Sequence, residues 1–382
     1  MTAAPEWRLL CLSASPTPQY TGIEELASRG VDWMHLSALA GIHGVRPLLY
    51  RALSTTARDV VPESALQRLA ADSRAIASRN LMMTGELLRL MDLFAEEDIE
   101  IVPFKGPLLS ATAYGDVSLR EFVDLDLLVR REQALLARSV LRKEGYRDGL
   151  SLSPRQNSRY VATQNEFPLE SERGLSVEIQ WAFAPRYFAM RLEPERLLSD
   201  LRVSRIGGRR LPSLSPENLL LTLCVHGAKH LWGRLAWVAD LAHVIETSPG
   251  IGWSRLHDRA NAIGCRRLVL TGLSLTTELF DTVLPSRFER AIASDEHVQA
   301  LSRKLRQRIQ TQGNHESGHS EMPLHLLHLQ MRERPMDRMR HVVRLAITPT
   351  LEDWRMLSVP DNLSFLYYPI RVVRLLSKYG RV

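Results

Sequence analysis

Two aspartates inside an otherwise apolar run constrain this chain more than any other feature. They are Asp124 and Asp126, within residues 122–129 (Phe-Val-Asp-Leu-Asp-Leu-Leu-Val). Successive side chains of a β-strand point to opposite faces, so the apolar residues at odd positions, from Val123 to Val129, would face a core. Both aspartates would share the other face, about 6.6 Å apart along the strand. Because buried carboxylates are costly unless they are paired or bind a metal, this pattern predicts either a cation site or an exposed edge strand.

The hydrophobic pattern around this strand predicts an α+β protein in three parts. Residues 22–97 place apolar side chains at helical spacing, whereas residues 99–104 and 175–181 are short β-rich runs. Helices are expected between the strands, and this alternation predicts a small α/β or α+β unit. The expected parts are an N-terminal helical region (1–97), a small α/β core (98–200) and a C-terminal helical domain (201–382).

Composition indicates a globular protein that suits an anionic ligand. The 382 residues carry a net charge of +6, and the pI is about 9.4. This charge suits a nucleotide or another phosphorylated ligand, but no basic run predicts specific binding of nucleic acid. The three cysteines form no C-x-x-C pair, and no apolar run reaches the roughly 20 residues of a transmembrane helix. A cytoplasmic location without a transmembrane segment is expected.

A cation site needs a further oxygen ligand beside the two aspartates, because divalent ions are usually held by three or more. Glu178 is the best candidate, since it lies within the run 175–181 and its apolar neighbours would point the other way. Asp124, Asp126 and Glu178 would then converge on two Mg²⁺ ions, or Mn²⁺, about 3.5–4 Å apart.

The turn after the first strand offers a phosphate site. Lys105-Gly106 follows the run 99–104 and precedes a predicted helix. Glycine permits close approach of a backbone, a helix N-terminus attracts phosphate, and Lys105 would add a positive charge. A plain strand–helix turn explains the same residues without a ligand. Arg120, four residues before Asp124, is either another phosphate contact or an ion-pair partner of the acidic site.

Basic and aromatic residues gather at residues 226–241. His226 and His230 lie four apart on one helix face, but a zinc site lacks a third ligand, since the next acidic residue lies about 15 Å farther along a helix. Histidines that only pack between helices are one interpretation. The other is a face that packs beside the core and contacts the base or phosphates of a nucleotide, formed by Lys229, His230, Arg234 and Trp237.

The motifs also occur in a characteristic order. They occupy residues 104–109, 114–116, 124–129, 144–146 and 226–241, with Arg120 before the aspartates. In this order they resemble the uncharacterised bacterial nucleotidyltransferase family of the polymerase-β-type superfamily, and the resemblance covers most of the chain. It implies an α+β fold with a small mixed-sheet nucleotidyltransferase core, in which Asp124, Asp126 and a later carboxylate hold magnesium and are catalytic. Glu178 is the residue at that later position.

Two departures from the family pattern bear on the donor. The usual Gly-Gly or Gly-Ser phosphate turn is Gly106-Pro107 here, and proline has no N–H to offer a phosphate. The usual Asp-Leu-His-Trp of the last core strand is Glu178-Ile179-Gln180-Trp181, and Gln180 cannot act as a proton shuttle.

Three functions are compatible with these motifs. The first is Mg²⁺-dependent transfer of a nucleoside monophosphate from an NTP to a hydroxyl or phosphate acceptor. The second keeps the same site but transfers the glycosyl group of a nucleotide-sugar donor. The third is a degenerate protein that binds a nucleotide without turnover, which the presence of all three carboxylates disfavours. No motif specifies the acceptor, which could be a small molecule or a peptide.

Overall fold

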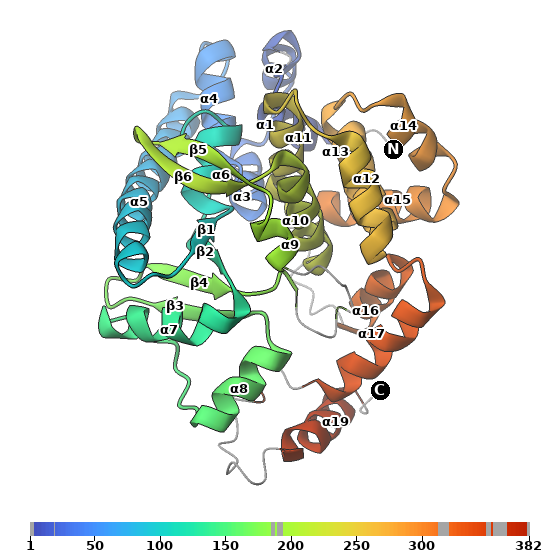
Figure 1. Cartoon of the computed structure of the whole chain (residues 1–382). Coiled ribbons are helices and arrows are strands. Elements are labelled where there is room, and N and C mark those ends of the chain that lie inside the picture. Colours follow the sequence, from blue (N-terminus) through green and yellow to red (C-terminus); the bar gives the residue numbers. More distant parts are fainter. Residues whose placement is uncertain are drawn as a thin grey trace.

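Helices fill the N-terminal part of the molecule, as the hydrophobic pattern predicts. The computed structural model describes residues 4–18, 20–184, 188, 194–311, 321–348, 353 and 365–379. A long helix, α5, runs along one side of the molecule, next to the sheet (Figure 1). The N-terminal helices are α1 (Pro5–Ala14), α2 (Tyr20–Ala27), α3 (Trp33–His43), α4 (Arg46–Thr56) and α5 (Glu63–Glu96).

A four-stranded mixed sheet follows. Its strands stand in the order β1 (Ile101–Pro103), β2 (Asp124–Val129), β4 (Ser176–Gln180) and β3 (Glu166–Glu170). β2 and β4 are parallel, and the outer strands run antiparallel to their neighbours. The predicted α+β class with a small mixed sheet is therefore confirmed. The helical segments between the strands are α6 (Gly106–Ala113), the 3-10 turn η1 (Arg131–Gln133), α7 (Ala134–Lys143) and α8 (Pro154–Thr163).

The sequence pattern missed β3 and a hairpin that follows the sheet. β3 contains Pro168, which cannot donate to a ladder and is tolerated because β3 lies at the sheet edge. After α9 (Pro194–Leu198), β5 (Leu201–Ile206) and β6 (Arg209–Leu214) form a separate antiparallel hairpin. The C-terminal region, expected to be helical from residue 201, thus begins with two strands.

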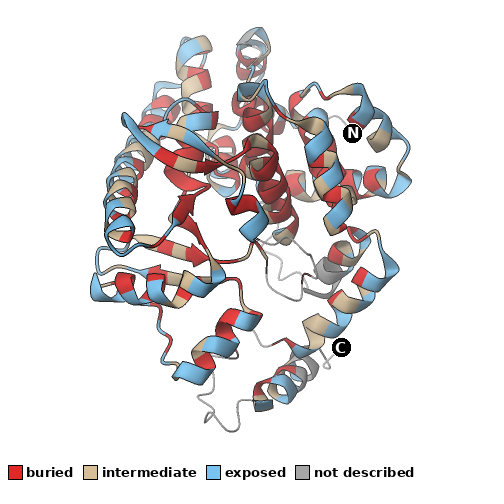
Figure 2. Ribbon diagram, in the orientation of Figure 1, coloured by how far each residue is buried: buried red, intermediate tan, exposed pale blue. Residues whose placement is uncertain are grey.

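The two faces of the sheet have different surroundings. Leu125, Leu127 and Val129 point into a core shared with α5 and α7, as the alternation predicts. Val123 does not join them, because β2 begins one residue later and leaves this side chain exposed. On the other face, Leu128 packs toward α10, and the carboxylates of β2 lie on that side. The contrast between buried strands and exposed outer helices is visible in Figure 2.

Most of the C-terminal helices pack with the N-terminal helices. A single hydrophobic core joins residues of α1, α4, α10, α11 and α13 with Val102 and Leu128 of the sheet. α10 is apolar around most of its circumference, which is expected of a central, buried helix. The predicted domain boundaries stay a prediction. The C-terminal helices are α10 (Pro216–Lys229), α11 (Leu235–Thr247), α12 (Trp253–Ile263), α13 (Arg266–Phe280), α14 (Ser286–Ala293), α15 (Glu296–Thr311), α16 (Glu321–Gln330), α17 (Pro335–Ile347) and α19 (Tyr367–Tyr379).

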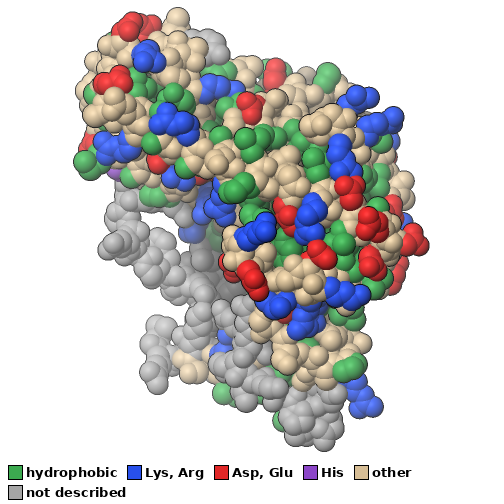
Figure 3. All heavy atoms as spheres, turned by 90° about the vertical axis from the view of Figure 1, so that its left-hand side faces the viewer, with side chains coloured by type: hydrophobic (Ala, Val, Ile, Leu, Met, Phe, Trp, Pro, Cys, Tyr) green, Lys and Arg blue, Asp and Glu red, His purple; other side chains and the backbone are tan. Residues whose placement is uncertain are grey.

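The surface carries mixed charge on the side where α5 lies. Basic and acidic side chains are interspersed on the described part of this face (Figure 3). Within the described residues, we find no helix with both the length and the apolar character required to cross a membrane.

A buried tryptophan shapes the turn between α10 and α11. Leu231 and Trp232 both adopt positive φ, which is uncommon for residues other than glycine. The Trp232 ring is fully buried and lies against Gly227 and Gly272. A methyl group on Gly227 would overlap the ring, and one on Gly272 would lie 2.9 Å from it. These glycines leave room for the ring that anchors the turn.

We expect Gly227→Ala to lower the free energy of unfolding by about 1–3 kcal/mol, because the added methyl group overpacks the Trp232 ring. Gly85→Ala is the matched control, since Gly85 also lies within a helix but its methyl group would meet nothing within 4 Å. That change should raise the free energy of unfolding by about 0.5–1 kcal/mol. Urea denaturation measures both, and effects of the same sign would contradict the packing argument.

Candidate functional site

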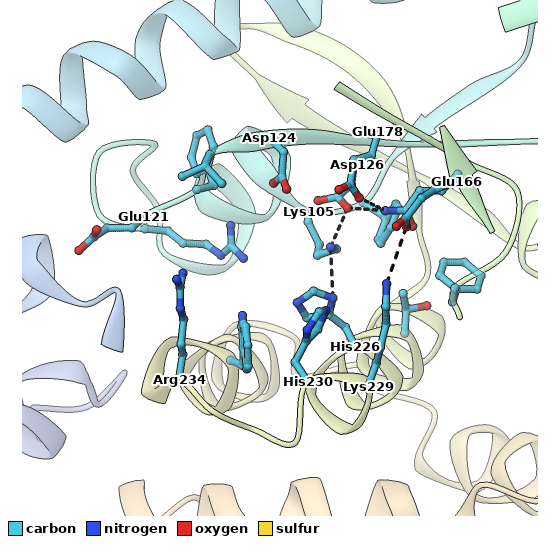
Figure 4. A pocket seen from close by; sticks show the side chains of 18 residues that line it. Lys105, Glu121, Asp124, Asp126, Glu166, Glu178, His226, Lys229, His230 and Arg234 are labelled. Atoms are coloured by element: carbon cyan, nitrogen blue, oxygen red, sulfur yellow. Dashed lines mark hydrogen bonds and ion pairs between the residues drawn. The ribbon is translucent and has the colours of Figure 1, made fainter. Parts of the chain in front are cut away.

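A cavity of about 470 Å³ lies between the sheet and the α10–α11 pair. Its volume is typical of a small-molecule site. In Figure 4, carboxylates from the strands form one wall, and Lys229, His230 and Arg234 form the opposite wall. The cavity therefore has an acidic wall and a basic, partly aromatic wall.

The acidic wall results from the pairing of β2 with β4. Asp126 is the direct partner of Glu178 across the two parallel strands. Asp124 lies two residues earlier on the same face, so the sheet brings the three predicted carboxylates together in one cavity. β3 adds a fourth carboxylate, Glu166, which sequence reasoning missed. The available indication was the alternation of Glu166 with the buried Phe167 and Leu169.

Lys105 enters the acidic wall from the turn between β1 and α6. Its Nζ lies 2.7 Å from Oδ1 of Asp126 and 3.5 Å from Nδ1 of His226. The Lys105 side chain is 9% exposed. Burial alone would lower the pKa of this ammonium group, but the charges of Asp126, Asp124 and Glu178 together raise the pKa above its ordinary value. Lys105 is therefore a buried, charged partner of the carboxylates.

Gly106 shapes the turn that directs Lys105 inward. It has a φ of 53°, and a Cβ at this position would lie 3.3 Å from the carbonyl oxygen of Asp124. Gly106 is buried and is absent from the cavity lining, whereas Lys105 lines the cavity. Nucleotide binding by Gly106 stays a prediction, and its observed contribution is the close approach between the turn and β2.

Gln180 connects two of the carboxylates. Its Nε2 donates hydrogen bonds to Oδ1 of Asp126 and to Oε2 of Glu178, both at 2.7 Å. One amide nitrogen carries two N–H groups and can donate to both carboxylates. Each ring nitrogen of a histidine, the residue expected here from the family pattern, carries at most one N–H group. The amide therefore holds the two carboxylates near each other.

Groups of the protein neutralise the carboxylates of the acidic wall only in part. Burial and the charge of Asp126 raise the pKa of Asp124 to about 6. Burial, followed by the charges of Glu166 and Asp126, raises the pKa of Glu178 to about 8. A raised pKa means that the ionised form of the carboxylate is disfavoured in its surroundings. A nearby cation stabilises that ionised form.

These residues fit a divalent cation in their chemistry. Carboxylate oxygens are the ligands that suit Mg²⁺ and Mn²⁺. Within the described residues, however, no three His, Cys, Asp or Glu side chains are grouped as a ready-made metal site. Lys105 and Gln180 instead take up oxygens of Asp126 and Glu178.

The basic wall combines two imidazoles, an indole ring and two cations. The rings of His226 and His230 lie 5.4 and 5.1 Å from the Trp237 ring. Loss of hydration and the charges of nearby lysines lower the pKa of both histidines, so they are neutral near pH 7. The Lys229 Nζ lies 3.8 Å from Glu166, and the Arg234 guanidinium lies 5.9 Å from the centre of the Trp237 ring.

Arg120 forms a buried ion pair with Asp240. Its guanidinium donates to both carboxylate oxygens of Asp240, at 2.7 and 2.9 Å, and Tyr114 Oη donates to the same carboxylate at 2.7 Å. Of the two predicted roles, ion-pair partner describes the observed contacts, but the partner is Asp240 on α11, not an aspartate of β2. Arg120 lines the cavity, and its predicted contact with a nucleotide stays a prediction.

The loop before β2 is held from three sides. Asp240 binds Arg120, and Arg46 of α4 binds Glu121 through two side-chain hydrogen bonds of 3.2 and 2.7 Å. Asn80 of α5 donates to the carbonyl oxygens of Val117 and Arg120, at 2.7 and 2.8 Å. These contacts fix the direction in which the chain enters β2, and so they help to position Asp124.

Comparison with families of known proteins matches residues 29–281 to a family described as uncharacterised nucleotidyltransferase. The chain belongs to this nucleotidyltransferase family. Its general function is nucleotidyl transfer, which implies a nucleotide donor. All residues that line the cavity lie within the matched segment. Neither the curated proteins nor the solved structures contain a match to the chain.

We expect Asp240→Asn in this nucleotidyltransferase to lower the free energy of unfolding by about 3–5 kcal/mol, because it leaves the buried Arg120 cation without a charged partner. Glu100→Gln is the control, since Glu100 forms an exposed pair with Arg130 at 3.1 Å and such pairs contribute about 1 kcal/mol or less. Chemical denaturation measures both. A small loss in Asp240→Asn would show that the loop does not depend on this pair.

Proposed function

We propose that this nucleotidyltransferase moves a nucleoside monophosphate from an NTP to a hydroxyl or phosphate acceptor with Mg²⁺ as its cofactor. The observation that supports this most strongly is the meeting of Asp124, Asp126 and Glu178 on one wall of a cavity, from two adjacent strands. Burial and the charges of neighbouring carboxylates raise the pKa of Asp124 and of Glu178, and a cation bound at the same place would favour their ionised forms.

The three carboxylates would hold the cation, which supplies charge neutralisation at the phosphates and activation of the attacking oxygen. In the reaction, an acceptor oxygen forms a bond to the α-phosphorus. The bond from that phosphorus to the bridging β-phosphate oxygen breaks, and pyrophosphate leaves. The proton of a hydroxyl acceptor passes to a carboxylate of the acidic wall or to solvent, because Gln180 cannot accept it.

The opposite wall suits the donor nucleotide. Trp237, with the neutral rings of His226 and His230 beside it, offers an aromatic surface on which a base can stack. Arg234 lines the cavity, and Figure 4 shows its side chain directed into it. Lys229 and Arg234 are therefore the cations of this wall that we assign to the phosphates.

A panel of NTPs labelled at the α-phosphate, tested beside nucleotide-sugars, examines this proposal. We expect the α-label to appear on an acceptor with release of pyrophosphate, in the presence of Mg²⁺ and a cell-extract fraction that supplies acceptors. Transfer of the sugar instead would favour the glycosyl-transfer alternative. Binding of a nucleotide without any product would favour the degenerate protein.

We expect Asp124→Asn to lower the rate of transfer at least about 100-fold, because it removes a charge that the site directs at the cation. The fold should persist, since Asp124 forms none of the short ion pairs that hold Lys105 and Arg120. Product formation and circular dichroism together measure this, with Glu100→Gln as a surface control. Undiminished turnover in Asp124→Asn would remove the proposed role of the acidic wall.

We expect Arg234→Ala to raise the KM for the nucleotide by about tenfold or more, with a smaller change in kcat. A charged hydrogen bond lost equally from the bound donor and the transition state changes KM alone. Arg130→Ala is the matched control, because Arg130 lies away from the cavity at the end of β2. Initial-rate kinetics measure both constants, and an unchanged KM would assign the phosphates to other residues.

A further inference from the structure

A lysine already forms an ion pair with one carboxylate of the acidic wall. Lys105 Nζ lies 2.7 Å from Asp126, and Asp124 and Glu178 contribute to the field around the same ammonium group. In Figure 4 the Lys105 side chain lies between the carboxylates and His226. The protein therefore supplies a positive charge of its own beside the carboxylates that would hold a cation in the proposed function.

Lys105 is held in this place by its backbone. A Cβ on Gly106 would lie 3.3 Å from the carbonyl oxygen of Asp124, so this turn lies close to β2. Below the ammonium group, Nδ1 of His226 lies 3.5 Å away. The remaining exposed fraction of the side chain, 9%, leaves little water to replace the Asp126 oxygen if the lysine were to leave.

Gln180 uses further oxygen capacity of the same group. Its amide binds Asp126 Oδ1, the atom that Lys105 also binds, and Glu178 Oε2. Two divalent ions would need most of the oxygens of the three carboxylates. Two carboxylate oxygens are already bound by donors of the protein, and the Lys105 ammonium group offsets one negative charge of the acidic wall.

We propose that Lys105 takes the place of one of the two cations of a two-metal site, so that this nucleotidyltransferase holds a single divalent ion. The inference rests on the proposed function, in which Asp124, Asp126 and Glu178 hold the cation. In this proposal, Lys105 is a fixed positive charge, and the turn at Gly106 directs it toward the carboxylates.

The number of Mn²⁺ ions bound by the full chain tests this. Electron paramagnetic resonance distinguishes one isolated ion from two ions about 3.5–4 Å apart, which couple. We would measure Mn²⁺ alone and Mn²⁺ with α,β-methylene-ATP. The wild-type chain should bind one uncoupled ion in both cases. Lys105→Met, which keeps the length but removes the charge, should bind two coupled ions.

Lys143→Met is the control, because Lys143 is exposed on α7, and it should bind one ion as the wild type does. Two coupled ions in the wild-type chain, or one ion in Lys105→Met, would overturn the inference and leave the proposed function intact. An absence of bound Mn²⁺ in the wild type would overturn the proposed function itself. If Lys105→Met is unfolded by circular dichroism, Lys105→Gln replaces it, and the wild-type count still decides.

Discussion

The parallel pairing of β2 with β4 is the constraint on which the site depends. It sets Asp126 directly opposite Glu178 and leaves Asp124 on the same face. The same pairing sends Leu125, Leu127, Val177 and Ile179 into the core on the other face, and their burial stabilises the register. A slip by one residue would turn the carboxylates into the apolar core and the apolar side chains toward the cavity, so the core and the site specify each other.

The carboxylates on this face repel one another, and other side chains of the protein offset part of this repulsion. Lys105 brings a buried ammonium group to Asp126, and Gln180 donates to both Asp126 and Glu178. The offset is incomplete, because the pKa of Asp124 is still raised to about 6 and that of Glu178 to about 8. In the proposed function, a cation would neutralise the charge that Lys105 and Gln180 leave on this wall.

The helical body supplies the second wall and fixes its position against the sheet. The buried group of Arg120, Asp240 and Tyr114 links the loop before β2 to α11. Trp232, accommodated by two glycines, sets the turn from α10 to α11. The ends of these helices therefore present Lys229 and Arg234 toward the carboxylates across a cavity, although the two aspartates of β2 lie more than a hundred positions earlier in the chain.

Local patterns in the sequence determined the α+β class, the aspartate strand, the Lys105-Gly106 turn and the candidate third carboxylate, because alternation, helical spacing and turn chemistry act over a few residues. β3 escaped this reasoning because an edge strand tolerates Pro168, and Glu166 escaped with it. Only the tertiary structure decided which charges are neutralised by which partners. Arg120 turned out to bind Asp240, 120 residues away, and Lys105 turned out to lie against Asp126. Ion pairs of this kind depend on the distances between segments that are far apart in the sequence, and a local pattern does not encode these distances. The packing of the sheet against α10 and α11 sets them.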